Sequence, residues 1–155
     1  MLFRSHKLLT NTVSLVRKEA TKKNISINAR FSKKTLLTRA DPNRLRQVFL
    51  NLLINAVDSI TTKGKVVIST EIMEGQNKPG RWLLIRFKDN GIGIPAEDVN
   101  NIFDPFFTTK SVGTGLGLTV SDKIIQEHHG IIEVESKFQK GTTFCVRLPV
   151  SLEET

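Results

Sequence analysis

Residues 46–60 read RQVFLNLLINAVDSI, and this stretch decides how the rest of the chain is interpreted. Its apolar residues leave little solvated surface, so a helix here must be largely buried. Asn51, Asn55 and Asp58 interrupt the apolar run, and Gln47 extends the same line backward. Spacings of i, i+4 and i+7 stack side chains along one side of a helix. The stretch therefore predicts a buried helix that carries a polar seam.

Two interpretations of this seam remain open on the helix alone. A buried amide without a partner costs about 1–3 kcal/mol, so Asn51 and Asn55 need partners. Those partners can be neighbouring backbone groups, which makes the seam structural. Alternatively, the seam lines a cleft where amide oxygens bind a hard cation and its phosphates, since Mg²⁺ takes oxygen ligands and keeps several waters.

The sequence around this helix predicts an α+β fold. Asp41-Pro42 supplies an N-cap followed by proline at the first helical position, so the central helix runs from Pro42 to about Ile60. Gly130 is a plausible C-cap for the last helix. Further helices are expected over residues 5–23, 95–102 and 117–128, and strands over 25–31, 65–73, 82–88, 131–136 and 142–149. Without strict βαβ alternation, this order favours a two-layer sandwich with helices on one face of a mixed sheet.

Two glycine-rich segments are candidates for ligand contacts. DNGIGIP at 89–95 directly follows a predicted strand, where a carboxylate can accept a hydrogen bond from an exocyclic amine; a tight turn in which Asp89 bonds its own backbone is the alternative. GTGLGL at 113–118 precedes a helix, and glycine-rich amides at a helix N-terminus form an anion site. This second segment lacks the final glycine of a dinucleotide fingerprint and the Gly-Lys-Ser/Thr of a P-loop.

The segment between the glycine loops, IFDPFFTTK at 102–110, suggests a hinged lid with an apolar anchor. Lys110 can bring a positive charge to a phosphate, although a solvated lysine on a loop that covers the core is the alternative.

Composition narrows the functional classes. The chain has 155 residues, 39% hydrophobic, with a net charge of +8. The positive charge comes as pairs along amphipathic stretches and lacks interleaved aromatic residues, so a solvated face is favoured over a nucleic-acid site. A single cysteine, Cys145, excludes an intramolecular disulfide. No stretch approaches the ~18 apolar residues of a membrane span, so a cytoplasmic domain is expected, with any membrane anchor lying in segments outside this chain.

Taken in order, these segments resemble the histidine-kinase branch of the Bergerat-fold ATPases. The combination of Asp58 with FFTTK at 106–110 resembles the nitrogen-regulation and sporulation kinases in particular. RQVFLNLLINAVDSI resembles the N box, DNGIG at 89–93 the first glycine box, and FDPFF at 103–107 the F box. GTGLGL resembles the second glycine box, and GTTF at 141–144 the final strand motif. The resemblance covers roughly residues 25–150.

The resemblance implies an ATP and Mg²⁺ site. It implies that Asn55 ligates Mg²⁺, that Asn51 supports the phosphates or the metal shell, and that Lys110 contacts the terminal phosphate. Asp89 would accept a hydrogen bond from the adenine amino group, and Thr142 would help to bind adenine. Further nucleotide contacts are implied at Asp58, Gly91, Gly93, Ile94, Phe103, Gly113, Thr114, Gly115, Leu116 and Gly117.

Two departures from the family pattern refine this expectation. Many sensor kinases have a basic residue where this chain has Asp58, so the basic phosphate contact shifts to Lys110. Hydrolytic relatives have a glutamate base where this chain has Asn51, and an amide cannot act as a general base.

The acceptor histidine of the family is not recognisable in this chain. His6 lacks the acidic residue and nearby proline that usually follow the acceptor, and His128 and His129 lie at a helix end. We therefore expect residues 1–23 to be the end of a dimerisation helix and a linker, residues 24–150 to be the ATP-binding catalytic domain, and residues 151–155 to be a frayed tail.

The expected function is γ-phosphoryl transfer from Mg-ATP to a histidine on a separate dimerisation domain of the same kinase. A response regulator would act downstream, and the fragment itself would be monomeric. The alternatives are a protein-serine kinase or ATPase of the same fold, and a nucleotide-binding or nucleic-acid-binding module without catalysis.

Overall fold

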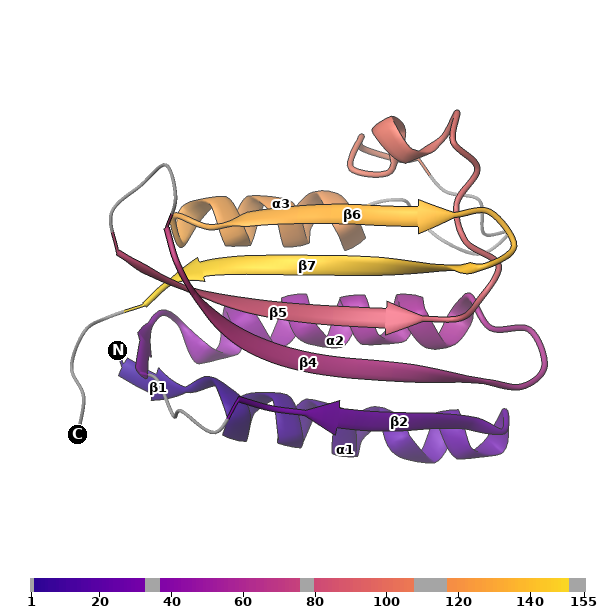
Figure 1. The fold of residues 1–155 in the computed structure, drawn as a ribbon, viewed down its shortest axis with the longest axis horizontal. Helices are drawn as coiled ribbons and strands as arrows, with labels where there is room; N and C mark the ends of the chain where they lie inside the picture. Colours follow the sequence, from indigo (N-terminus) through magenta and orange to yellow (C-terminus); the bar gives the residue numbers. More distant parts are fainter. Residues whose placement is uncertain (1, 33–36, 76–79, 108–116, 151–155) are drawn as a thin grey trace.

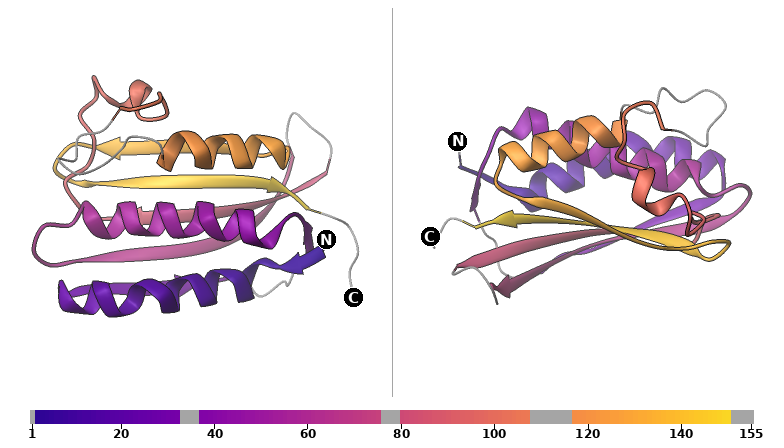
Figure 2. Two further views of the ribbon diagram at one scale, coloured as in Figure 1. Left: turned by 180° about the vertical axis from the view of Figure 1, so that it is seen from behind. Right: turned by 90° about the horizontal axis from the view of Figure 1, so that it is seen from above.

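The computed structural model describes residues 2–32, 37–75, 80–107 and 117–150. Three helices lie on one face of a five-stranded sheet (Figures 1 and 2), which confirms the predicted two-layer α+β sandwich. The helices are α1 (Ser5–Lys22), α2 (Pro42–Asp58) and α3 (Gly117–Glu127). The strands of the sheet are β2 (Ile25–Arg30), β4 (Gly64–Glu74), β5 (Arg81–Asp89), β6 (Ile131–Lys137) and β7 (Gly141–Pro149).

The sheet is mixed, with the strand order β2-β4-β5-β7-β6. Among the strands that the structure describes in this sheet, β2 and β4 pair in parallel and the other neighbours are antiparallel. Strand β5 occupies the centre, and its inward residues Leu83, Ile85 and Phe87 are at most 1% exposed. In this order the C-terminus of β5 and the β6–β7 turn lie at the same end of the sheet, and the candidate site lies there.

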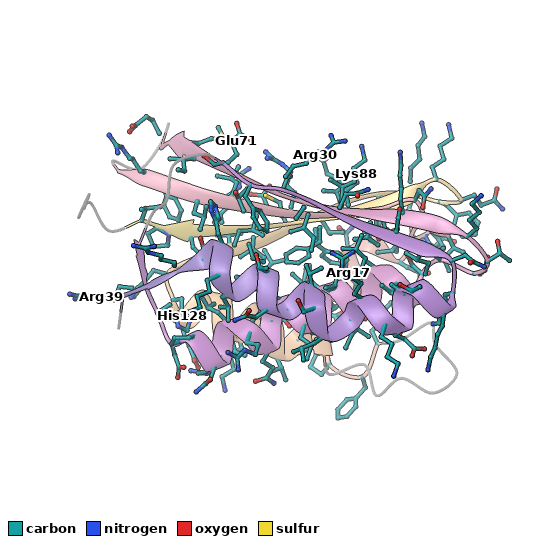
Figure 3. The ribbon with its side chains drawn as sticks, turned by 90° about the horizontal axis from the view of Figure 1, so that it is seen from below. Arg17, Arg30, Arg39, Glu71, Lys88 and His128 are labelled. Carbon is teal, nitrogen blue, oxygen red and sulfur yellow. The ribbon has the colours of Figure 1, made fainter. Side chains whose placement is uncertain are left out.

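The opposite face of the sheet has no helix over it in the described part of the chain. Figure 3 shows Arg30, Glu71 and Lys88 on this open face. Here the Arg86 guanidinium donates to the Glu71 carboxylate at 2.7 Å, which raises the pKa of Arg86. The sheet is therefore apolar toward the helices and charged toward solvent, as expected for a two-layer sandwich.

Helix α2 forms the centre of the helical layer. Asp41 caps it by accepting the Asn43 N–H at 3.0 Å, and Pro42 occupies the first turn, as the sequence predicts. Its apolar side packs on the sheet, where the rings of Phe49 and Phe87 lie 6.0 Å apart. Burying an aromatic side chain of this kind stabilises the fold by about 1.5–3 kcal/mol.

Helix α1 belongs to the same core. Leu8, Leu9, Val13 and Val16 are at most 6% exposed and join one cluster with the residues of α2 and the sheet. The apolar side of α1 is therefore covered by the same sandwich that α2 and the sheet form. The apolar spacing of residues 5–23 correctly indicated a helix but could not show which surface covers it.

Two short strands were not predicted. Strand β1 (Leu2–Arg4) pairs antiparallel with β3 (Leu37–Arg39) in a separate two-stranded sheet. Three-residue strands lack the alternation that reveals longer ones.

The prediction of a helix over residues 95–102 was wrong. This segment forms successive turns and the short 3₁₀ helix η1 (Val99–Asn101). Its backbone bonds join residues three apart, as in Asp98 N–H to Pro95 O at 2.9 Å and Asn101 N–H to Asp98 O at 2.8 Å. Only Ile102 of this segment is buried, so no apolar face supports further helical turns.

Helix α3 ends where expected, although the residue that stops it differs. His129, not Gly130, adopts the left-handed conformation, with φ of 64°. The N–H groups of Gly130 and His129 return to the carbonyls of Ile125 and Gln126 at 2.9 and 3.0 Å, which is a Schellman arrangement. Gly130 is needed for space, because a Cβ there would lie 2.3 Å from the Arg147 carbonyl oxygen.

Candidate functional site

The predicted site residues that the structure describes gather at one end of the sandwich. At this end β5 and α2 finish, the β6–β7 hairpin turns and α3 begins, whereas β1 lies at the other end (Figure 1). Asp89, Thr142, Asn51 and Asn55 come from three elements that are far apart in the sequence.

Asp89 is the last residue of β5, and its side chain is nearly enclosed. The residue is 5% exposed, and its Oδ1 accepts the Gly91 N–H at 2.9 Å. Desolvation raises the pKa of Asp89, while hydrogen bonds from the Gly91 N–H, the Ser59 side chain and the Thr142 N–H lower it. A carboxylate offers about four lone-pair positions, so these donors leave capacity for an amine.

The first glycine loop is wedged between α2 and the β6–β7 hairpin. Ile92 N–H donates to the Ser59 carbonyl at 3.0 Å, and Gln139 N–H donates to the Ile92 carbonyl at 2.5 Å. A Cβ on Gly91 would lie 2.1 Å from Ser59 Oγ, and a Cβ on Gly93 would lie 2.2 Å from the Lys137 carbonyl oxygen. Both glycines are therefore required for this close packing.

Gly93 also has φ of 71°, a conformation that glycine adopts without the steric penalty of other residues. The loop is thus held by its backbone in one path beside Asp89.

Thr142 on β7 is the cross-strand partner of Asp89 on β5. Both residues are 5% exposed. The Thr142 hydroxyl lies 2.7 Å from the hydroxyl of Ser136, which in turn accepts the Ile94 N–H at 2.8 Å. The structure therefore brings the carboxylate, the glycine loop and the final strand motif into one cluster.

Asn51, Asn55 and Asp58 follow one side of α2 toward the same end. Asn51 Nδ2 donates to Ser121 Oγ on α3 at 3.1 Å. Asn51 Oδ1 lies close to Gly117, where an added Cβ would be only 2.5 Å from it. Asn55 is half-buried. Asp58 forms an ion pair with Lys23 at 3.5 Å, and both side chains are about 40% exposed.

Phe103 anchors the segment that precedes the second glycine box. Its ring meets Phe144 edge-on, with centroids 6.5 Å apart, and its carbonyl accepts the Thr119 hydroxyl of α3 at 2.9 Å. Phe106, by contrast, is 73% exposed. The other predicted lid residues lie outside the described residues: Lys110, Gly113, Thr114, Gly115 and Leu116.

The sequence did not point to Ser59, Asn90, Ser121 or Ser136, all of which shape the site. Asn90 Oδ1 accepts the Lys65 N–H at 2.9 Å and so joins the glycine loop to the start of β4. Each of these side chains meets its site partner only through tertiary contacts, such as the 42 residues that separate Ser136 from Ile94.

His6 and His128 make structural contacts. His6 stacks on Phe31 with centroids 4.9 Å apart and its Nε2 lies 3.1 Å from Thr70 Oγ1; burial lowers the pKa of His6. His128 Nδ1 contacts the Ile124 carbonyl at 2.7 Å, and its Nε2 accepts the Asp41 N–H at 3.2 Å. His128 thus joins the end of α3 to the start of α2.

Comparison with known proteins identifies the family. Residues 40–152 match the model of the histidine kinase-, DNA gyrase B- and HSP90-like ATPases. The chain belongs to this ATPase family. Among solved structures it is similar to the catalytic domain of histidine kinase ThkA, with 33% identity and a TM-score of 0.84, covering 96% of this chain and 94% of that one.

The curated relatives include a sensor histidine kinase and a sporulation kinase. It is 38% identical over 147 residues to the sensor histidine kinase ZraS of Escherichia coli strain K12, and 36% identical over 143 residues to sporulation kinase E of Bacillus subtilis strain 168. These matches cover 94% and 92% of this chain, but the chain spans only 30% and 19% of those relatives.

The chain is thus a histidine kinase catalytic domain, and an ATPase domain of this family binds ATP. The resemblance drawn from the five sequence boxes is confirmed. No helix within the described residues is long and apolar enough to cross a membrane.

Proposed function

We propose that this catalytic domain binds Mg-ATP and transfers the γ-phosphoryl group to a histidine on a separate dimerisation domain of the same sensor kinase. The observation that carries the proposal is the convergence of Asp89, Thr142, Asn51 and Asn55 at one end of the sandwich. The Asp89 carboxylate and the Thr142 hydroxyl would suit the adenine base. The two amides, Asn51 and Asn55, would suit the phosphates and their metal ion.

Asp89 would recognise the adenine amino group. Its carboxylate is fixed by the Gly91 N–H at 2.9 Å and shielded from water, so a hydrogen bond from an amine gains strength there. Guanine has a carbonyl oxygen in place of that amino group, and a carboxylate repels it. The paired glycines Gly91 and Gly93 would allow the base to approach the loop backbone, with Ile94 completing this wall.

The amide line of α2 would face the phosphates and Mg²⁺. Asn55 would hold the ion through its side-chain oxygen, with Asn51 beside it, and such hard oxygen donors fit Mg²⁺. The hydrogen bond from Asn51 Nδ2 to Ser121 leaves Asn51 Oδ1 pointing away from Ser121, which supports this role. When bound, Mg²⁺ would neutralise charge on the phosphate oxygens.

The remaining nucleotide contacts are assigned by the order of the motifs. Lys110 would contact the terminal phosphate, Phe103 would anchor the lid, and Asp58 would border the phosphates from the end of α2. Lid backbone would surround the phosphates at Gly113, Thr114, Gly115, Leu116 and Gly117.

Transfer to an external imidazole fits this site better than hydrolysis. Asn51 occupies the position where a water-activating base would be needed, and its amide already donates to Ser121. Catalysis would then rest on positioning ATP and stabilising charge while the acceptor arrives. His6 and His128 hold structural contacts, which supports an acceptor on another domain.

The expected partner, compartment and oligomeric state follow from this assignment. In the complete protein a response regulator would receive the phosphoryl group, and the catalytic domain would work in the cytoplasm. By itself the domain would be monomeric.

Phosphotransfer to a supplied acceptor tests the proposal. Radiolabelled ATP is incubated with this chain alone, with its dimerisation domain added, and with the same mixture carrying Asn55→Ala. We expect acid-labile, base-stable label only on the added domain, and little label with Asn55→Ala. High acceptor concentrations are needed, because separating the domains removes an effective concentration of about millimolar. Label on this chain by itself, or none on the added domain at any concentration, would contradict the proposal.

A further inference from the structure

Ser136 joins three segments of the nucleotide site through one oxygen atom. It lies near the end of β6, half-buried on the side of the sheet that the helices cover. Its Oγ accepts the Ile94 N–H at 2.8 Å, lies 3.1 Å from the Gly141 carbonyl oxygen and lies 2.7 Å from Thr142 Oγ1. The first glycine loop, the hairpin turn and β7 therefore share this hydroxyl.

Counting protons fixes the direction of these bonds. The Gly141 carbonyl oxygen carries no proton, so only Ser136 can donate in that contact. Ser136 has a single hydroxyl proton, and the Ile94 N–H already donates to its oxygen. All three contacts are hydrogen bonds only if the Thr142 hydroxyl donates to Ser136. The proton of Thr142 is then occupied, and its remaining lone pairs can only accept.

This arrangement places two acceptors side by side. Thr142 Oγ1 lies on the strand paired with β5, directly across from Asp89, and both residues are 5% exposed. An amino group has two protons for two acceptors, whereas a carbonyl oxygen would meet lone pairs from both. A site built to bind an amino group rejects a ligand that lacks it, because its buried acceptors are left unpaired.

We propose that Ser136 is a positioning residue that holds the Thr142 hydroxyl as an acceptor and so makes the site selective for purines with an amino group at position 6. This inference rests on the ATP-binding role assigned to Asp89 above. Ser136 itself need not touch the nucleotide, since it acts through the proton that Thr142 gives it.

A purely structural role for Ser136 predicts a different result. Removing a hydroxyl that only supports the hairpin would weaken all nucleotides alike, because the cradle would loosen without changing its acceptors. Selectivity between two purines that differ at position 6 therefore separates the two roles.

The experiment compares ATP with inosine triphosphate, which has a carbonyl oxygen at position 6. Their affinities are measured by calorimetry for the wild-type chain, Ser136→Ala, Ser136→Thr and Thr142→Val. Ser69→Ala is the matched control, because Ser69 is a half-buried strand residue on the open face, paired with Arg86. Hydrogen exchange at the Ile94 amide reports whether the Ser136 contact has been broken.

We expect the wild-type chain to prefer ATP. Ser136→Ala should reduce that preference by about fivefold, the size of one neutral hydrogen bond, and should speed exchange at Ile94. Ser136→Thr, which keeps the hydroxyl, and Ser69→Ala should leave the preference unchanged. Thr142→Val should lower it as Ser136→Ala does, and this variant decides the question if Ser136→Ala does not fold.

Two results from the variants would overturn the inference. One is an equal loss of affinity for both nucleotides in Ser136→Ala; the other is an unchanged preference in Thr142→Val. A wild-type chain that binds neither nucleotide would instead overturn the proposed function, and this inference with it. A wild-type chain that binds both equally would refute selectivity at position 6 while leaving nucleotide binding intact.

Discussion

Replacing Asp89 by asparagine should change nucleotide affinity and fold stability in opposite directions. Asparagine keeps an oxygen that can accept the Gly91 N–H, so the turn can keep its hydrogen bond. It removes the negative charge from a residue that is 5% exposed. The substitution therefore separates a residue kept for ligand binding from one kept for a turn.

The affinity change follows from the hydrogen bond that is lost. A bond between a charged acceptor and the adenine amino group contributes about 1.5–3 kcal/mol, so Asp89→Asn should weaken ATP binding by about 10–150-fold. The affinity for inosine triphosphate should not fall and should rise, because its carbonyl oxygen no longer meets the repelling carboxylate. Calorimetric titration of both nucleotides measures the difference.

The stability change follows from the raised pKa of Asp89. Because desolvation lifts its folded pKa above the ordinary value of 3.8, ionisation of Asp89 opposes folding. The penalty is absent below the unfolded pKa and grows as pH rises through the folded pKa. The nucleotide-free Asp89→Asn variant should therefore be more stable than the wild type at neutral pH, and this advantage should disappear near pH 3.

Denaturant unfolding across this pH range tests the expected stability change. Asp98→Asn is the control, because its carboxylate lies outside the Asp89 cluster. If Asp89→Asn binds ATP normally and unfolds more easily at neutral pH, Asp89 is a turn residue and the site has been assigned wrongly.

Three further changes test other parts of the site. Asn55→Ala should abolish the Mg²⁺-dependent part of ATP affinity while preserving the circular dichroism spectrum; ATP binding that is equally Mg²⁺-dependent would remove Asn55 from the metal site. Gly93→Ala should lower the thermal midpoint by at least about 3 °C, because the left-handed backbone alone costs about 1–2 kcal/mol and the new Cβ meets the Lys137 carbonyl. An unchanged midpoint would show that the loop has another path. His128→Leu should lower the midpoint by about 2–4 °C through loss of the bond from the Asp41 N–H, which calorimetry would register; no shift would mean that water replaces it.

The main elements and the family could be read from local chemistry. The apolar spacing of α2, the Asp41-Pro42 start and the strand patterns depend on neighbours within a few turns, and the structure confirms them. The polar seam at Asn51, Asn55 and Asp58 was also evident, because helical spacing places such residues on one side. The five motifs in order indicated a histidine kinase catalytic domain, which the comparisons confirm.

Other features depended on contacts that no local pattern encodes. The surface that covers α1 is one of them, because an amphipathic helix shows an apolar face without showing what packs on it. The strands β1 and β3 were missed because three residues carry no period.

The sequence by itself determined which groups are available to the site, namely a carboxylate at a strand end, amides on a buried helix and a threonine in the last strand. The tertiary structure alone decided how they are held. The β5–β7 register sets Thr142 across from Asp89, α3 brings Ser121 to Asn51, and Ser136 reaches Ile94 across 42 residues. The physical reason is that side-chain identity is a local property, whereas burial, hydrogen-bond direction and the pKa of Asp89 arise only when distant segments exclude water together.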